Sequence, residues 1–477
     1  MPRCAPTIRA LASAALLPLM LAGCMASPAP EIATPTPDLP ETFFFAPDAD
    51  AQTALGALMP TGDPAYRALS GAALASAPSL AEALARIDSA RAGTRAAGAA
   101  RLPDITADGS VRQTRINTSQ FGEAGRQGFV PAEQTTYGTN IVASWDADIF
   151  GRLKAQERAA LARIDAASAQ AQGVRLALLA EIAASVTDWR VIEARAAAID
   201  ADVAAAKQLA SLAKVREDAG IAPGFDRVRA EATASSSQVR LAALESERAR
   251  LIGRLVTLTG QDAASVRAAL ATTAPAMIVA APPAALPSEL LTNRPDVVAA
   301  AANLAASDAD LAAAARARFP RITLTGIIGL AAFQPESFFD EDSIVGTLTG
   351  AIAGPLLDFG RVRAGIDAAA ADKRAAFAAY QGAVFQALGD AEAGYGLVTA
   401  ADAEARLSVE ERDLLNRAAS LAETRYRAGL ASFLEVLEAR RAADASGERA
   451  AAALGRASRA RILLWQALGG DDFGVGS

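Results

Sequence analysis

The chain repeats one order of apolar and polar patterns in two halves, which a proline-rich stretch at 271–287 separates. Each half begins with a helical pattern, from Ser79 to Ala100 in the first and from Pro295 to Arg318 in the second. Pro295 suits the first turn of a helix, and Asp296 beside it complements the helix dipole. The recurrence predicts two structural repeats within one chain.

Two strand-like runs follow the first helix of each half. They alternate in part between apolar and polar positions, and Thr, Ile, Val and Gly are prominent in them. The runs are 102–119 and 135–150 in the first half, and 319–333 and 343–359 in the second. A strand that crosses a bilayer at a tilt needs about 9–11 residues. These lengths therefore predict two membrane-spanning hairpins.

A very long helical pattern comes after each hairpin, at about 152–219 and 361–428. Apolar residues in the first pattern step by three, four or seven positions, which approximates a coiled-coil seam. They are Leu178, Ile182, Val186, Trp189, Ile192, Ile199 and Val203. At 1.5 Å per residue, each helix would be about 100 Å long. Helices of this length exceed the depth of a globular domain and are expected to span a gap.

Each long helix is predicted to end at a glycine and to return as another helix. Gly220 and Gly429 fit the left-handed conformation that closes a helix. They lie in the stretches 216–232 and 426–440, whose patterns become helical again after the glycine. The second part of each half is therefore expected to be a helical hairpin.

A short motif stands at each passage from strand to long helix. It contains an acidic residue, a bulky apolar residue, glycine and arginine, with Asp148, Gly151 and Arg152 in the first half and Asp358, Gly360 and Arg361 in the second. The second copy includes Asp-Phe-Gly, which binds magnesium in protein kinases. A metal ligand has no reason to recur at the same place in both halves, whereas a structural joint does. We therefore expect Asp358 to form a helix cap or a salt bridge.

Composition and charge argue against catalysis and against nucleic-acid binding. The 477 residues include no histidine, so the kinase catalytic loop and the commonest general base are missing. The chain is 52% hydrophobic but only 5% aromatic, which suits closely packed alanine-rich helices. Its net charge of −7 does not indicate the basic surface that nucleic-acid binding requires. We expect no enzymatic activity, no metal and no non-covalent cofactor.

The N-terminus has the features of a lipoprotein signal peptide. Arg3 and Arg9 precede and flank the apolar run 10–23, which is too short to span a membrane. The run ends in Leu-Ala-Gly-Cys, which resembles the bacterial lipobox and makes Cys24 the expected lipidation site. The alternative is an ordinary secretory signal that happens to end beside a cysteine. Met25 is not the aspartate that signals retention in the inner membrane.

These patterns divide the chain into six segments. They are a signal peptide at 1–23, a lipid-anchored proline-rich tether at 24–75, a first repeat at 76–270, a linker at 271–287, a second repeat at 288–470 and a tail at 471–477. Four strands per chain cannot close a barrel, and lipid does not tolerate open sheet edges. Several copies must therefore pool their strands.

The chain resembles TolC-like outer-membrane efflux factors, in particular the OprM- and NodT-like lipoprotein branch that serves resistance-nodulation-division systems. The resemblance covers essentially the whole mature chain. It rests on the lipobox, the two joints, the turn at 426–439 and the stretches 286–307 and 315–329. It implies an α+β membrane protein, a homotrimer whose twelve-strand transmembrane barrel continues as an α-helical periplasmic tunnel. It also implies a passive outer-membrane exit duct that docks, through a periplasmic adaptor (membrane fusion) protein, to an inner-membrane pump.

The resemblance also implies roles for the hairpin tips. Glu435 and Glu438 match the acidic constriction of the periplasmic gate, although the family more often has aspartate there, and Asp226 is its counterpart on the first tip. The adaptor would meet the tips at Gly220, Ile221, Gly429 and Leu430. Acidic residues in a first helical turn are also favoured by the helix dipole alone, and the glycines would close helices in any case.

Two other functions remain open at this point. An exit duct for type I protein secretion would share the architecture, but such proteins usually lack a lipobox. A coiled-coil lipoprotein that serves only as a strut would not need glycine-rich hairpins or an internal repeat. The sequence does not identify the exported substrate, and drugs, dyes, solvents and host-derived compounds are all compatible with it.

Overall fold

The computed structural model describes residues 38–47, 54–123, 127, 131–273 and 280–470, which form two compact units. The first unit takes in 88–166 and 301–379. The second takes in the described parts of 36–87, 167–300 and 380–477. Both halves of the sequence therefore contribute to each unit.

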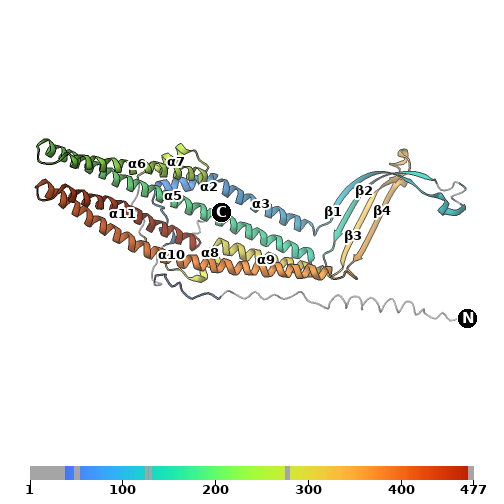
Figure 1. Ribbon diagram of the computed structural model, residues 1–477. Helices are drawn as coiled ribbons and strands as arrows, with labels where there is room; N and C mark the ends of the chain where they lie inside the picture. The colour runs from blue at the N-terminus through green and yellow to red at the C-terminus, as the bar shows by residue number, and fades with distance from the viewer. Residues whose placement is uncertain (1–37, 48–53, 124–126, 128–130, 274–279, 471–477) are drawn as a thin grey trace. The chain divides into compact units, whose positions relative to one another are not determined.

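The first unit contains one antiparallel sheet in the order β1-β2-β3-β4 (Figure 1). Its strands are β1 (Asp104–Arg115), β2 (Glu133–Asp146), β3 (Arg321–Ala332) and β4 (Ile344–Ala353). The connections contain the short helices η2 (Thr118–Phe121), η4 (Pro335–Ser337) and η5 (Glu341–Ser343). Both predicted hairpins are confirmed, and the β2–β3 pairing joins them into one sheet.

Four helices each contribute part of their length to the first unit. They are α3 (Pro78–Ala99), α5 (Arg152–Asp218), α9 (Pro295–Arg316) and α10 (Arg361–Arg427). Arg163 on α5 pairs with Asp310 on α9, and Lys373 on α10 pairs with Asp308 on α9 at 2.6 Å. These ion pairs place α9 beside both long helices.

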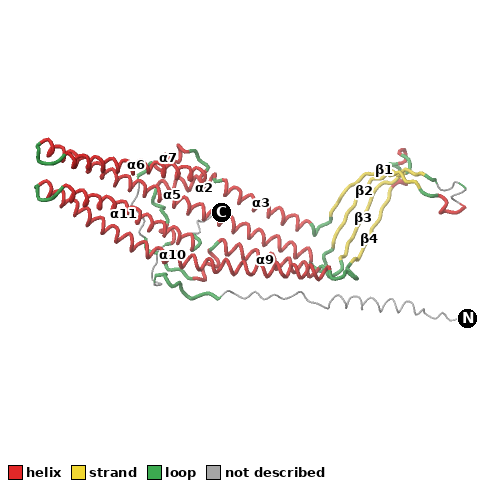
Figure 2. The backbone as a smooth tube through the Cα atoms, viewed as in Figure 1, coloured by secondary structure: helices red, strands yellow, loops and turns green. Residues whose placement is uncertain are grey.

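The second unit contains the two helical hairpins (Figure 2). The return helices are α6 (Gly224–Thr259) after α5 and α11 (Phe433–Ala467) after α10. The shorter elements are η1 (Leu55–Leu58), α2 (Pro64–Ser76), α7 (Ala263–Leu270), η3 (Pro287–Glu289) and α8 (Leu290–Asn293). Each long helix has 67 residues, so the predicted bounds of 152–219 and 361–428 were correct to within one residue.

The core of the second unit lies along the predicted seam. All seven seam residues of α5 are buried, and they belong to one cluster with apolar residues of the other helices. Trp465 of α11 and Tyr395 of α10 are among its largest fully buried side chains. The period of the apolar residues therefore identified the packed face of α5 correctly.

The predicted tether at 24–75 needs a correction at its C-terminal end. Leu58, Met59 and Leu69 are buried in the core of the second unit. Asp63 caps α2 by accepting a hydrogen bond from the backbone N–H of Ala65 at 2.8 Å. Residues from η1 onward are thus part of the folded body, because apolar side chains of η1 and α2 pack against the long helices. Cys24 and the signal peptide lie outside the described residues.

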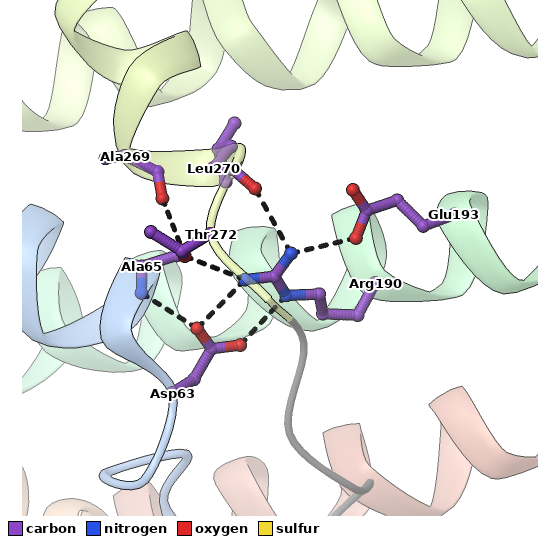
Figure 3. A network of polar contacts seen from close by, with 7 residues as sticks. All are labelled: Asp63, Ala65, Arg190, Glu193, Ala269, Leu270 and Thr272. Carbon is purple, nitrogen blue, oxygen red and sulfur yellow. Dashed lines mark hydrogen bonds and ion pairs between the residues drawn. The ribbon is translucent and has the colours of Figure 1, made fainter.

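A buried arginine holds α2 to α5 (Figure 3). Arg190 Nε and Nη2 donate to the two carboxylate oxygens of Asp63 at 3.0 and 3.1 Å. Its remaining donors reach Glu193, the backbone oxygen of Leu270 and the hydroxyl of Thr272. All five guanidinium N–H groups are used, so the cost of burying this charge is offset at every donor.

Two stretches, Pro64–Ala99 and Pro295–Arg316, are long and apolar enough to cross a membrane by length and composition alone. The first is divided between α2 and α3. The second carries Asp308 and Asp310 in the ion pairs described above, and such charges are costly in hydrocarbon. The composition of both stretches reflects the abundance of alanine in helices that pack closely.

Candidate functional site: a membrane sheet, two joints and two helical tips

The register of the sheet separates its side chains into one apolar and one polar face. Ile105 pairs with Ala143, Ile141 with Ile328, and Gly326 with Leu348, so these residues share a face. The apolar part of this face comprises Ile105, Ala107, Gly109, Val111, Gln113, Tyr137, Thr139, Ile141, Ala143, Trp145, Ile322, Leu324, Gly326, Ile328, Leu330, Ala332, Ile344, Gly346, Leu348, Gly350 and Ile352, and the face ends in the polar residues Arg115, Glu133 and Thr135. Most of its large members are exposed, Leu348 by 75%, while Tyr137, Ile322 and Leu330 are half-buried. A sheet with such a face is suited to lipid.

The opposite face is largely polar. It carries Asp108, Ser110, Arg112, Thr136, Asn140, Thr323, Thr325, Thr347 and Thr349. Asn140 donates to Asp108 across the strands at 3.2 Å. Apolar and polar residues therefore alternate between the two faces of the sheet, as they do between the lipid-facing and interior faces of transmembrane barrels.

Two aromatic residues mark the limits of the apolar face on β2. Tyr137 and Trp145 both belong to it, and the eight residue steps from one to the other span about 26 Å. Outer-membrane barrels carry an apolar band about 25 Å tall between two aromatic girdles. Trp145 Nε1 donates to the backbone oxygen of Arg101 at 2.9 Å, which anchors this end of the strand beside the helices.

The first joint is a helix cap. The carboxylate of Asp148 accepts hydrogen bonds from the backbone N–H groups of Leu153 and Lys154, both at 2.8 Å. Asp148 and Gly151 have φ angles of 42° and 73°, a left-handed region that glycine and aspartate tolerate best. Arg152 does not cap; it pairs with Asp146 at 2.9 Å and ties the helix back to β2.

The second joint repeats this cap. Asp358 accepts from the backbone N–H groups of Val362 at 2.8 Å and Gly360 at 3.1 Å. These donors lower the pKa of Asp358. The predicted cap is confirmed, and the Asp-Phe-Gly resemblance to kinases is accounted for by helix capping. Gly360 has a φ of 90°, and Arg361 is exposed.

Both hairpin tips close with the same hydrogen bonds. The N–H of Gly220 donates to Glu217 O at 2.9 Å and that of Ile221 to Arg216 O at 3.0 Å. Gly429 and Leu430 make the equivalent bonds at 3.0 and 2.8 Å. The glycines have φ angles of 72° and 75°, so the predicted left-handed conformation is confirmed. Ile221 and Leu430 remain 67% and 70% exposed.

Two of the candidate gate residues, Asp226 and Glu435, lie in the first turns of the return helices, and Glu438 follows in the second turn of α11. Glu435 and Glu438 are exposed on α11, and Asp226 is half-buried at the corresponding position of α6. The backbone N–H of Glu435 donates to the N-cap residue Ser432 at 3.2 Å. Within the part of the chain that the structure describes, none of the three carboxylates has a cationic partner within ion-pair distance.

Sequence reasoning missed a contact between the two tips. Arg216 of α5 lies 4.6 Å from the ring centre of Tyr426 on α10, and it donates to the backbone oxygen of Tyr426 at 3.2 Å. Burial raises the pKa of Tyr426; Arg216 lowers it, and the nearby charge of Asp226 raises it further. The two residues occupy adjacent rather than matching positions in the repeats, so the repeat pattern did not reveal their pairing.

Known proteins that resemble this chain in sequence and fold are outer-membrane proteins of efflux systems. The family model "Outer membrane efflux protein" matches residues 69–261 and 286–470. The pyoverdine export outer membrane protein OpmQ of Pseudomonas aeruginosa is 27% identical over 95% of both chains. The toluene efflux pump outer membrane protein TtgF of Pseudomonas putida is 30% identical over 86% of this chain and 84% of its own. The outer-membrane channel OprN superposes with a TM-score of 0.83 at 26% identity, over 93% of this chain and 99% of its own.

The amphipathic sheet, the joints and the helical hairpins define an outer-membrane efflux duct with a TolC-like fold. The chain belongs to the outer membrane efflux protein family. The predicted family and α+β fold class are thereby confirmed.

Proposed function

We propose that three copies of this chain form a passive exit duct for small molecules, with a twelve-strand barrel in the outer membrane and a helical tunnel beneath it. The observation that carries the proposal is the four-strand sheet, which has one apolar face and two unpaired edges, at β1 and β4. Lipid does not tolerate such edges, and pairing β1 of one copy with β4 of the next removes them all.

The duct works with a periplasmic adaptor and an inner-membrane pump of the resistance-nodulation-division type. Relatives named for pyoverdine, toluene and solvent export support this assignment. The exposed tips at Gly220, Ile221, Gly429 and Leu430 are the proposed adaptor contacts. A photo-crosslinker placed at position 221 or 430 should capture the purified adaptor, and one placed at the exposed residue Arg406 should not.

A lipid on Cys24 attaches the N-terminus to the membrane. The lipobox supports this proposal, and mass spectrometry of the mature N-terminal peptide tests it. The duct itself needs no catalytic residue and no metal, because the pump supplies the energy.

The gate is formed by Glu435 and Glu438, with Asp226 beside them. Threefold symmetry would turn each residue into a ring of negative charge that narrows the pore and favours cations. The unpaired, exposed carboxylates of Glu435 and Glu438 support this role.

The combined substitution Glu435→Ala and Glu438→Ala should raise single-channel conductance in planar bilayers and reduce cation preference. The matched control replaces Asp372 and Glu410, two exposed acidic residues of α10, by alanine. An unchanged conductance and selectivity in the gate variant, or an equal change in the control, would reject the gate assignment.

A further inference from the structure

A cavity of about 830 Å³ lies in the first unit, where the strands meet the helices. Both joints line it, together with the end of α9 and the segment that leads into β3. Of the four strand residues in its wall, Asp146, Arg321 and Ala353 belong to the polar face of the sheet, and Ile322 belongs to the apolar face. Most of the strand residues around the cavity thus lie on the polar face of the sheet.

The cavity wall has an excess of positive charge. Its acidic residues are already engaged: Asp146 by Arg152, Asp310 by Arg163, and Asp148 by two backbone N–H groups. Three further arginines, Arg316, Arg321 and Arg361, line the same space. Among the described residues, no carboxylate lies within ion-pair distance of these three guanidinium groups.

Arg316 is held in place without being neutralised. Its Nη1 donates to the backbone oxygen of Ala312 at 3.1 Å, one turn earlier on α9. Gly151 of the first joint lies beside it, since a Cβ added at this glycine would be 3.7 Å from Arg316 Nε, an ordinary van der Waals distance. The charge is half-buried and still lacks an anion.

The same cavity has an aromatic and apolar wall. Phe150 of the first joint and Phe319 stack with ring centres 4.8 Å apart and an angle of 7° between the planes. Pro320 and Pro355 extend this wall. A ligand that matches the cavity carries a negative charge beside an aromatic or aliphatic body.

We propose that this cavity is a binding site for amphiphilic organic anions, such as aromatic sulfonates and carboxylates, on their way from the helical tunnel into the barrel. Arg316, Arg321 and Arg361 bind the anionic group, and Phe150 and Phe319 contact the apolar body. In the trimer, the three sites form a ring of positive charge. The placement inside the duct rests on the function proposed above, and the binding chemistry rests on the cavity alone.

Equilibrium dialysis with the full chain in lipid nanodiscs tests the site, with empty nanodiscs as the reference. The probes are 2-naphthalenesulfonate, the neutral 2-naphthol and inorganic sulfate. Wild-type protein should bind 2-naphthalenesulfonate more tightly than either other probe. Replacing Arg316, Arg321 and Arg361 together by glutamine should weaken that binding by about tenfold or more, since charge-assisted hydrogen bonds are lost.

The matched control replaces Arg374, Arg406 and Arg417 by glutamine, which removes the same charge from exposed positions of α10 outside the cavity. Equal weakening in the control would overturn the proposal, and so would unchanged binding in the cavity variant. Sulfate binding as tight as that of the naphthalenesulfonate would refute the amphiphilic site. Binding without any channel current would instead reject the proposed duct and leave the site standing.

Discussion

Single residues decide how the N-terminal segment is attached to the long helices. Arg190 is 7% exposed and Asp63 is 3% exposed, so both charges lie in the protein interior. A buried ion pair contributes little compared with a well-packed apolar pair, but removing one partner leaves an uncompensated charge. Asp63 also caps α2, so its loss affects two elements.

Asp63→Ala should therefore lower the free energy of unfolding by about 3–5 kcal/mol. Glu193→Ala is the matched control, because it removes a half-exposed partner of Arg190 and should cost only about 1 kcal/mol or less. Denaturant titration of the detergent-solubilised protein measures both. Equal effects for the two variants would contradict the assignment of Asp63 as the principal partner.

A carboxyl pair between the helical hairpins makes stability depend on pH. Asp202 of α5 lies against Asp444 of α11, and both are less than 10% exposed. Burial, the hydrogen bond to Asp444 and its charge raise the pKa of Asp202 to about 8, against the opposing charges of Arg240 on α6 and Arg440 on α11. Arg240 also forms an ion pair with Glu448 of α11, and this second carboxylate weakens the stabilising effect of Arg240 on an ionised Asp202.

The folded chain thus keeps a proton on Asp202 that the unfolded chain loses near pH 4. Its contribution to stability is complete below about pH 4 and is lost as the pH rises toward 8. Asp202→Asn should remove this decline, so that the variant gains stability relative to wild type between pH 5 and pH 8. Unfolding titrations across this range measure the slope, with the exposed Asp200→Asn as the control. A slope that persists in Asp202→Asn would count against the shared proton.

Among the secondary-structure elements, the four strands are the ones that we assign to the membrane. Leu348 and Thr347 are neighbours on β4 but point to opposite faces of the sheet. Lipid-facing positions of outer-membrane barrels tolerate charge poorly, whereas interior positions face water.

Leu348→Arg should therefore destabilise the folded barrel by about 2–4 kcal/mol, and Thr347→Arg by much less. Urea unfolding in lipid vesicles, followed by heat-modifiable migration, measures the difference. If Thr347→Arg is the more disruptive of the two, the lipid-facing side has been assigned wrongly.

The long helices and strands could be predicted because the sequence patterns that specify them lie within each element. The period of the apolar residues located the seam of α5, and glycines marked both turns. The short helices α2 and α7 were missed, because their apolar residues acquire a pattern only against the long helices. The partners of Arg190 and the arginines of the cavity could not be foreseen either, since residues distant in the sequence come together only through the fold.

At the scale of the whole molecule, assembly depends on which strands pair with the two open edges of the sheet. Among the residues that the structure describes, β1 and β4 each lack a neighbouring strand on one side, and their polar faces contain Asp108 and Thr347. A closed ring of three chains pairs every β1 with a β4 of another copy. The only cysteines of the sequence, Cys4 and Cys24, precede the first repeat, so introduced cysteines can report this pairing without competing thiols in the strands.

Asp108→Cys should be combined in turn with Val345→Cys, Thr347→Cys, Thr349→Cys and Ala351→Cys, all on the polar face. Mild oxidation of the protein in outer membranes should give a covalent trimer for at least one pair, because cross-linking within a closed ring of three copies stops at three chains. Each single-cysteine variant should remain monomeric on denaturing gels. Ladders that extend beyond three chains would indicate an open polymer, and the absence of any cross-linked species in all four pairs would exclude the β1–β4 seam. The pair that cross-links also fixes the stagger between neighbouring copies, and with it the tilt of the strands in the barrel.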